Sequence, residues 1–224
     1  TAEIDKLARQ ALAQAIPATV KEVIKQTEAD MPPRTMRGDP GYEYEDTSTR
    51  GDELIERYED DPTLLVVPML ERFSQVLTTV VREHVEKLIP SMKHIMDMID
   101  EFRVKGGAAE WASGYTVEIE ARELSTDEYA QKAGGYMGTT NMKVFVDQAK
   151  VFQAGCDLIR DEMSGESEDG FGDMLNAIVP TFTHEYAHLE QELRRPQKYN
   201  AAKKYTSRDF GYMADKTSRG KRNS

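Results

Sequence analysis

Two histidines and a glutamate form the group of side chains in this sequence whose spacing is typical of metal chemistry. They are His184, Glu185 and His188, within the stretch Thr181–Leu189. On a helix, side chains four residues apart lie on one face, so both imidazoles can reach one metal ion at about 2.0–2.1 Å. Glu185 follows the first histidine, where its carboxylate would contact a metal-bound water rather than the metal. The pattern predicts a zinc site with Glu185 as the general base.

The alternative is a polar helix face whose histidines only form hydrogen bonds. The chain has four histidines, so this spacing seldom arises by chance, and apolar residues flank it on a predicted helix. His84 and His94 lie ten residues apart with no carboxylates at ligand spacing. For those two, a surface or core position is favoured over a metal site.

The motif resembles that of the zincin metallopeptidases. Thr181 stands three residues before the first histidine, where that family has Thr or Val, whereas Glu190 departs from the usual apolar residue. The resemblance covers about residues 110–200. It implies a zinc-dependent peptidase with a peptide or protein substrate. It also implies that Asn141–Asp147 is an edge strand, which pairs with the extended substrate beside the metal-bearing helix.

A third ligand is needed for such a site, and the sequence offers no histidine after His188. Glu192 is eight residues from His184, a rise of about 12 Å along a helix, which is too far for one ion. Asp209, 21 residues past His188, is the candidate within this chain. Two alternatives remain open: a ligand beyond Ser224, or a site that is no longer catalytic.

The elements that position these residues can be read from hydrophobic periodicity. Residues 3–29 repeat every 3.6 residues, and residues 34–61 are rich in Gly and acidic residues. Two later segments alternate between apolar and polar residues, as half-buried strands do. The two segments that follow them are predicted to be helices. The sequence therefore predicts a mostly helical α+β fold. Its expected parts are a helical region (1–106) containing an acidic linker (34–61), a zincin-like domain with a small sheet (107–195) and a basic tail (196–224).

Charge is unevenly distributed along the chain. The net charge is -11, yet residues 194–224 hold ten Lys or Arg and two Asp, a charge of +8, which leaves -19 on the rest. We expect this tail to lie outside the catalytic core. It would be either a solvated end or a contact to nucleic acid or to an acidic partner.

Composition bounds the remaining possibilities. Cys156 is the one cysteine, so no internal disulfide can form, and we expect it to be a small buried residue. No uninterrupted apolar run approaches membrane-spanning length, and the first residues are not those of a secretory signal. A location in the cytoplasm or in a larger assembly is therefore expected. A second hypothesis is an assembly protein, such as a virion component, that retains an inactive zincin-like domain. Its N-terminal helices would bind a partner or a second copy.

Overall fold

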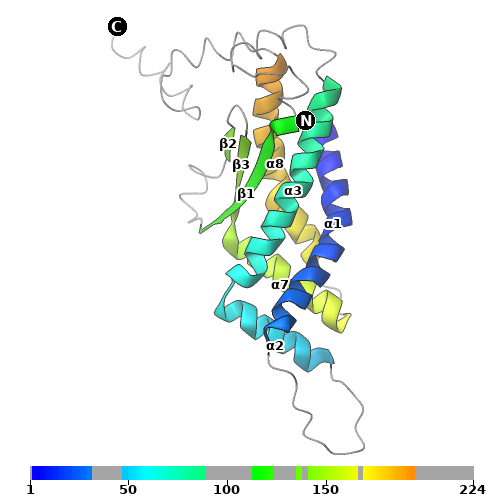
Figure 1. Cartoon of the computed structure of the whole chain (residues 1–224), viewed down its shortest axis with the longest axis vertical. Helices are drawn as coiled ribbons and strands as arrows, with labels where there is room; N and C mark the ends of the chain where they lie inside the picture. The colour runs from blue at the N-terminus through cyan, green and yellow to red at the C-terminus, as the bar shows by residue number, and fades with distance from the viewer. Residues whose placement is uncertain are drawn as a thin grey trace, which may run out of the picture.

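The computed structural model describes residues 2–31, 47–88, 113–123, 135–137, 141–165 and 169–194. Within these ranges the chain forms five helices and three strands (Figure 1). In chain order they are α1 (Ala2–Ala29), α2 (Thr47–Asp60), α3 (Thr63–Leu88), β1 (Thr116–Arg122), β2 (Gly135–Met137), β3 (Asn141–Asp147), α7 (Gln148–Ser164) and α8 (Gly170–Arg194). The predicted α+β, mostly helical fold class is confirmed for this part of the chain.

Helix α1 follows the predicted apolar repeat, and Pro17 lies inside it. A proline in the interior of a helix commonly interrupts it, yet α1 continues past Pro17. Ile16 and Val20, on either side of the proline, are both buried. An interior proline costs a helix about 3 kcal/mol. Burial of two aliphatic side chains contributes about 1.5–3 kcal/mol each, which is enough to carry the helix through Pro17.

Helix α2 lies within the segment predicted to be an acidic linker. It is longer than the short helix expected near residues 52–58, because Leu54, Ile55 and Tyr58 are buried and the helix packs mainly against α7. The Tyr58 hydroxyl donates a hydrogen bond of 2.9 Å to Thr27 Oγ1 of α1. Burial raises the pKa of Tyr58. Residues 34–46 of the predicted linker lie outside the described residues.

Helix α3 carries the apolar stripe expected after Pro62, and Phe73, Leu77 and Val81 are fully buried. The sequence contains no uninterrupted apolar run of membrane-spanning length. Averaged over 18 residues, however, α3 has a hydropathy of 1.4, so by length and composition it could span a membrane. That is weak support for a membrane span, since the core helix of a folded domain meets the same criteria. Here α3 packs against α1 and β1.

The sheet has the order β1-β3-β2, with β1 parallel and β2 antiparallel to β3. The prediction that Asn141–Asp147 is an edge strand is therefore wrong, because β3 is bonded on both sides. Its side chains alternate between buried and half-buried positions, as predicted. Alternation of apolar and polar side chains indicates that one face of a strand is buried. It gives no information on how many other strands are hydrogen-bonded to that strand. Hence the sequence could not separate a central strand from an edge.

The edge of β1 that faces away from β3 is covered by polar side chains of α3. Three of these side chains, four residues apart on one helix face, bond to alternate residues of the chain, two within the strand and one just before it. The four-residue step rises about 6 Å along the helix, and two residues advance about 6.6 Å along the strand, so the two series stay in step. The bonds join Ile119 N–H to Ser74 Oγ (2.9 Å), Val117 N–H to Thr78 Oγ1 (2.9 Å) and Arg82 Nε–H to the Tyr115 carbonyl oxygen (2.7 Å).

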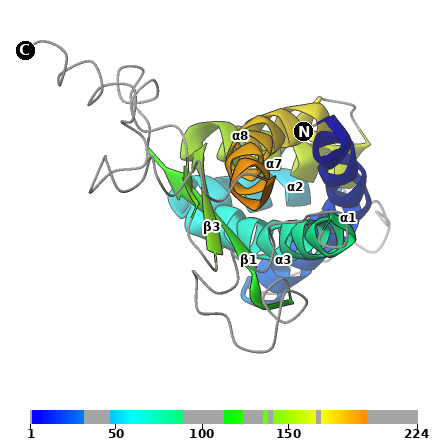
Figure 2. The same cartoon turned by 90° about the horizontal axis from the view of Figure 1, so that it is seen from above.

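The described elements share one hydrophobic core. Seen from above, α8 lies among α1, α3 and α7 (Figure 2). Helices from residues 1–106 and elements from residues 107–195 bury side chains in the same cluster. The predicted boundary at Gly106-Gly107 and the basic tail lie outside the described residues. The apolar stripes of α1 and α3 are buried within this chain, so they do not serve as the surface of these helices that would bind a partner or a second copy.

Helices α7 and α8 approach closely at Gly170. A Cβ atom there would lie 2.8 Å from the Leu158 backbone nitrogen, and a backbone atom cannot move aside as a side chain can. The turn into this contact begins at Gly165, whose φ of 70° lies in the left-handed region that glycine adopts readily. Gly165 and Gly170 therefore allow α8, the helix that carries the two histidines of the motif, to pack closely on α7.

Cys156 should be unreactive in the folded chain. It is buried, as predicted, and burial raises the pKa of its thiol from 9.0 to about 11. The reactive thiolate is therefore scarce at neutral pH. We expect an aromatic disulfide reagent at pH 8 to label the chain in denaturant and not in buffer. Rapid labelling of the native chain would contradict this burial. Because folding raises this pKa, the stabilisation due to the neutral thiol is lost as pH rises from 9.0 to about 11.

Candidate metal site on helix α8

The candidate site lies well inside a long helix. Proline is tolerated in the first turn of a helix, so Pro180 is compatible with a helix that begins there or with one that runs through it, and α8 runs through it from Gly170. His184 and His188 therefore lie on consecutive turns of established helix, as their spacing predicts. His184 is exposed and His188 is half-buried, so the pair lies at the surface of the helix and is accessible from solvent.

The two imidazoles converge. Their Nε2 atoms are 3.2 Å apart, and the rings meet edge to face with centroids 4.8 Å apart. Two nitrogens bound to one tetrahedral zinc ion at about 2.05 Å each would be about 3.3 Å apart. The donor set and its spacing thus fit two of the ligands of a zinc ion, and the same 3.2 Å contact equally fits a hydrogen bond between the two rings, which is the alternative stated for this helix face. Partial burial, and then the neighbouring His184, lower the pKa of His188, so its ring is neutral at neutral pH.

Glu185 differs from the two histidines in its environment. It is the next residue after His184, about 100° further round the helix. Its exposed fraction is 5%, so the carboxylate lies on the buried flank of α8 beside the histidine pair. Burial of a carboxylate is costly unless it is bonded or protonated, which is why buried acids are often functional.

A second histidine contact holds α8 against the rest of the fold. The Tyr186 hydroxyl and the buried His84 Nδ1 of α3 share a hydrogen bond, and the rings meet edge to face at 5.4 Å. The other ring nitrogen of His84 lies 3.6 Å from Glu3 of α1. His84 is therefore a bonded core histidine, as predicted. His94 lies outside the described residues.

Polar contacts between α1 and α8 complete this positioning. Thr183 Oγ1 donates a hydrogen bond of 3.3 Å to Asp5, which also accepts from Arg9 at 2.9 Å. Arg9 reaches Asn176 of α8 at 3.4 Å. Together with Tyr186, these contacts occupy the side of α8 that faces α1 and α3. The two histidines are left on the other side.

The sequence did not single out the contact between Tyr186 and His84. In the sequence, Tyr186 is only an uncharged residue between the two histidines of the motif. The signal that could have found it is helical phase: Phe182, Tyr186 and Leu189 fall on one apolar face, all three are buried, and a buried tyrosine needs a partner for its hydroxyl.

The third ligand stays a prediction. Asp209 lies outside the described residues, as does the whole basic tail. Within the described ranges, no group of three His, Cys, Asp or Glu side chains is arranged to bind a metal ion. The structure therefore brings together the two predicted histidine ligands, with Glu185 beside them, and does not bear on Asp209.

Comparison with known proteins gives no relative. No protein-family model, no curated protein and no solved structure matches this chain. The function must therefore be inferred from the residues and contacts described above.

Proposed function

We propose that this chain is a zinc-dependent peptidase of the zincin type. The observation that carries the proposal is the 3.2 Å separation of the His184 and His188 Nε2 atoms. That separation suits two ligands of one tetrahedral ion. Bound zinc would lower the pKa of a coordinated water toward about 7. Glu185 would accept the proton of that water and pass it to the departing amine.

The arrangement of the sheet supports a modified version of the substrate site. The zincin resemblance implies an edge strand beside the metal-bearing helix. In this chain β2 is antiparallel to β3, lies at the end of the strand order and packs against α8. We therefore propose that an extended substrate pairs with β2, Gly135–Met137, in place of Asn141–Asp147.

Zinc content tests the metal site directly. The full-length chain, purified without chelator, should hold one zinc ion per chain by elemental analysis. Replacement of His184 or His188 by Ala should remove at least nine-tenths of it, because one remaining imidazole binds the ion far more weakly. Replacement of His94 by Ala is the matched control and should leave the zinc bound. Wild-type chain without stoichiometric zinc would contradict the proposal.

The same measurement examines Asp209 as the third ligand. If its carboxylate completes the site, Asp209→Ala should weaken zinc binding, whereas Asp215→Ala, at the other acid of the tail, should not. Equal zinc affinity in all three chains would remove Asp209 from the proposed ligand set.

The second candidate function is an assembly protein with an inactive zincin-like domain. It is favoured by two histidines that have no third ligand within the described ranges. A partner would then bind outside the apolar stripes of α1 and α3, which the chain buries itself. The basic tail remains a proposed contact to nucleic acid, whose affinity would fall steeply with salt. A folded chain that binds no zinc and hydrolyses no peptide would support this function.

A further inference from the structure

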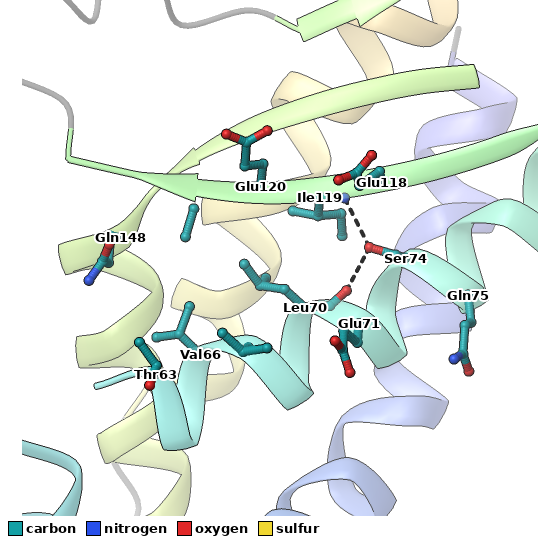
Figure 3. A pocket seen from close by; sticks show the side chains of 12 residues that line it. Thr63, Val66, Leu70, Glu71, Ser74, Gln75, Glu118, Ile119, Glu120 and Gln148 are labelled. Atoms are coloured by element: carbon teal, nitrogen blue, oxygen red, sulfur yellow. Dashed lines mark hydrogen bonds between the residues drawn. The ribbon is translucent and has the colours of Figure 1, made fainter. Parts of the chain in front are cut away.

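A groove of about 560 Å³ lies between α3 and β1, apart from the histidine pair. Its apolar lining includes Val66, Val67 and Leu70 from α3 and Ile119 and Ala121 from β1. In Figure 3, Val66, Leu70 and Ser74 rise from the helix toward the strand. Val67 has 47% of its surface exposed, which makes it one of two large apolar side chains in the described residues with such exposure. The groove can therefore receive an apolar side chain from solvent.

The polar cover of the β1 edge stops where this groove begins. Of the α3 side chains that bond to the strand edge, Ser74 is the nearest to the N-terminus of the helix. Its hydroxyl accepts a hydrogen bond from Ile119 N–H. Four and eight residues earlier on the same helix face stand Leu70 and Val66, which have no polar atom to offer. The outward-facing backbone groups alternate along a strand, so those of Ala121 point to the same side as those of Ile119. Within the described residues, no α3 side chain bonds to them.

The charged side chains that line the groove are all carboxylates, and two cationic side chains beside it pair with them. Glu71, Glu118 and Glu120 line it, and no Lys, Arg or His does so. Glu118 and Glu120 lie on the far side of the strand from α3 (Figure 3). There Lys143 of β3 pairs with them at 3.4 and 3.8 Å, and Arg122 of β1 pairs with Glu120 at 3.0 Å. An occupant that carries positive charge at alternate positions would meet these carboxylates on one face and the apolar groove on the other.

We propose that this groove binds an extended cationic segment of a partner protein, added as a strand to the edge of β1 beyond Ile119. The Ile119 carbonyl and both backbone groups of Ala121 would bond to the segment. One aliphatic or aromatic side chain of the segment would enter the groove over Leu70 and Val66, with Lys or Arg residues on either side of it. Strand addition of this kind obtains affinity from the main chain and selectivity from alternate side chains. The site is on the sheet edge opposite β2 and is independent of zinc.

The first test uses the full-length wild-type chain and the probe peptide Lys-Ile-Lys-Val-Lys-amide with a fluorophore attached to its N-terminus, with binding followed by fluorescence anisotropy. The probe is then N-methylated at one residue at a time. Because alternate residues of an added strand face its partner, methylation should weaken binding at least about tenfold at every second position and little at the others. Equal effects at all positions, or no binding at millimolar probe, would overturn the proposal.

Chain variants supply the second test. Ala121→Pro removes the outward N–H without touching the ladder to β3 and should weaken probe binding about tenfold or more, whereas Ala121→Val adds similar bulk and keeps the donor. Glu71→Lys should also weaken binding. Its control, Glu83→Lys, makes the same change at an exposed position of α3 outside the groove. Binding equal to wild type in both Ala121→Pro and Glu71→Lys would count against strand addition here.

Discussion

Replacing Glu185 by Gln is expected to lower the rate of peptide hydrolysis about 10²–10⁴-fold while leaving the zinc content unchanged. The amide has almost the same shape as the carboxylate but cannot accept a proton from a metal-bound water. The two histidines are untouched, so the proposed zinc site keeps both of its described ligands. The measurement is kcat on a quenched fluorescent peptide at full zinc occupancy, with circular dichroism to show that the fold is retained, because Glu185 is 5% exposed.

Glu190→Gln is the matched control, since it makes the same change at a half-buried position on the same helix, outside the stretch from His184 to His188. It should keep the wild-type rate. A Glu185→Gln chain as active as wild type would exclude this residue as the general base. If the wild-type chain binds zinc but hydrolyses no peptide, and Glu185→Gln changes nothing, the assembly function is favoured over the peptidase.

Replacing Thr78 by Val is expected to lower the free energy of unfolding by about 2 kcal/mol. The Thr78 hydroxyl accepts from Val117 N–H at 2.9 Å and lies 3.3 Å from the Val117 carbonyl oxygen. Valine has the same shape and removes the hydroxyl, so both backbone groups at a half-buried strand edge lose their partner. An unsatisfied buried group costs about 1–3 kcal/mol, and partial access of water keeps the sum below the upper limit. Urea unfolding measures the change.

The neighbouring residue provides the control for that substitution. Thr79 is exposed, and its hydroxyl donates only to the Gln75 carbonyl oxygen, at 3.2 Å, within its own helix. Thr79→Val should therefore change the free energy of unfolding by less than about 0.5 kcal/mol, the usual range for surface substitutions. Equal losses in the two variants would mean that helix propensity, and not the cover of the β1 edge, is responsible.

Local patterns in the sequence determined most of the secondary structure. The 3.6-residue repeat located α1, α3 and α7, and alternation located β3 at Asn141–Asp147. These elements follow from side-chain periodicity, which needs no knowledge of neighbours. The same holds for the candidate site, because helical spacing alone predicts that His184 and His188 converge, and their Nε2 atoms lie 3.2 Å apart.

Tertiary structure decided what depends on residues far apart in the chain. It placed β3 in the middle of the sheet, because strand neighbours are set by pairing and not by the pattern of one strand. It also joined His84 to Tyr186 across 102 residues, and Ser74 to Ile119 across 45. Ser74 and Thr78 read in the sequence as ordinary polar positions of an amphipathic helix. Only when β1 lies against α3 do their hydroxyls become the partners of a strand edge, because a hydrogen bond requires two groups within about 3 Å.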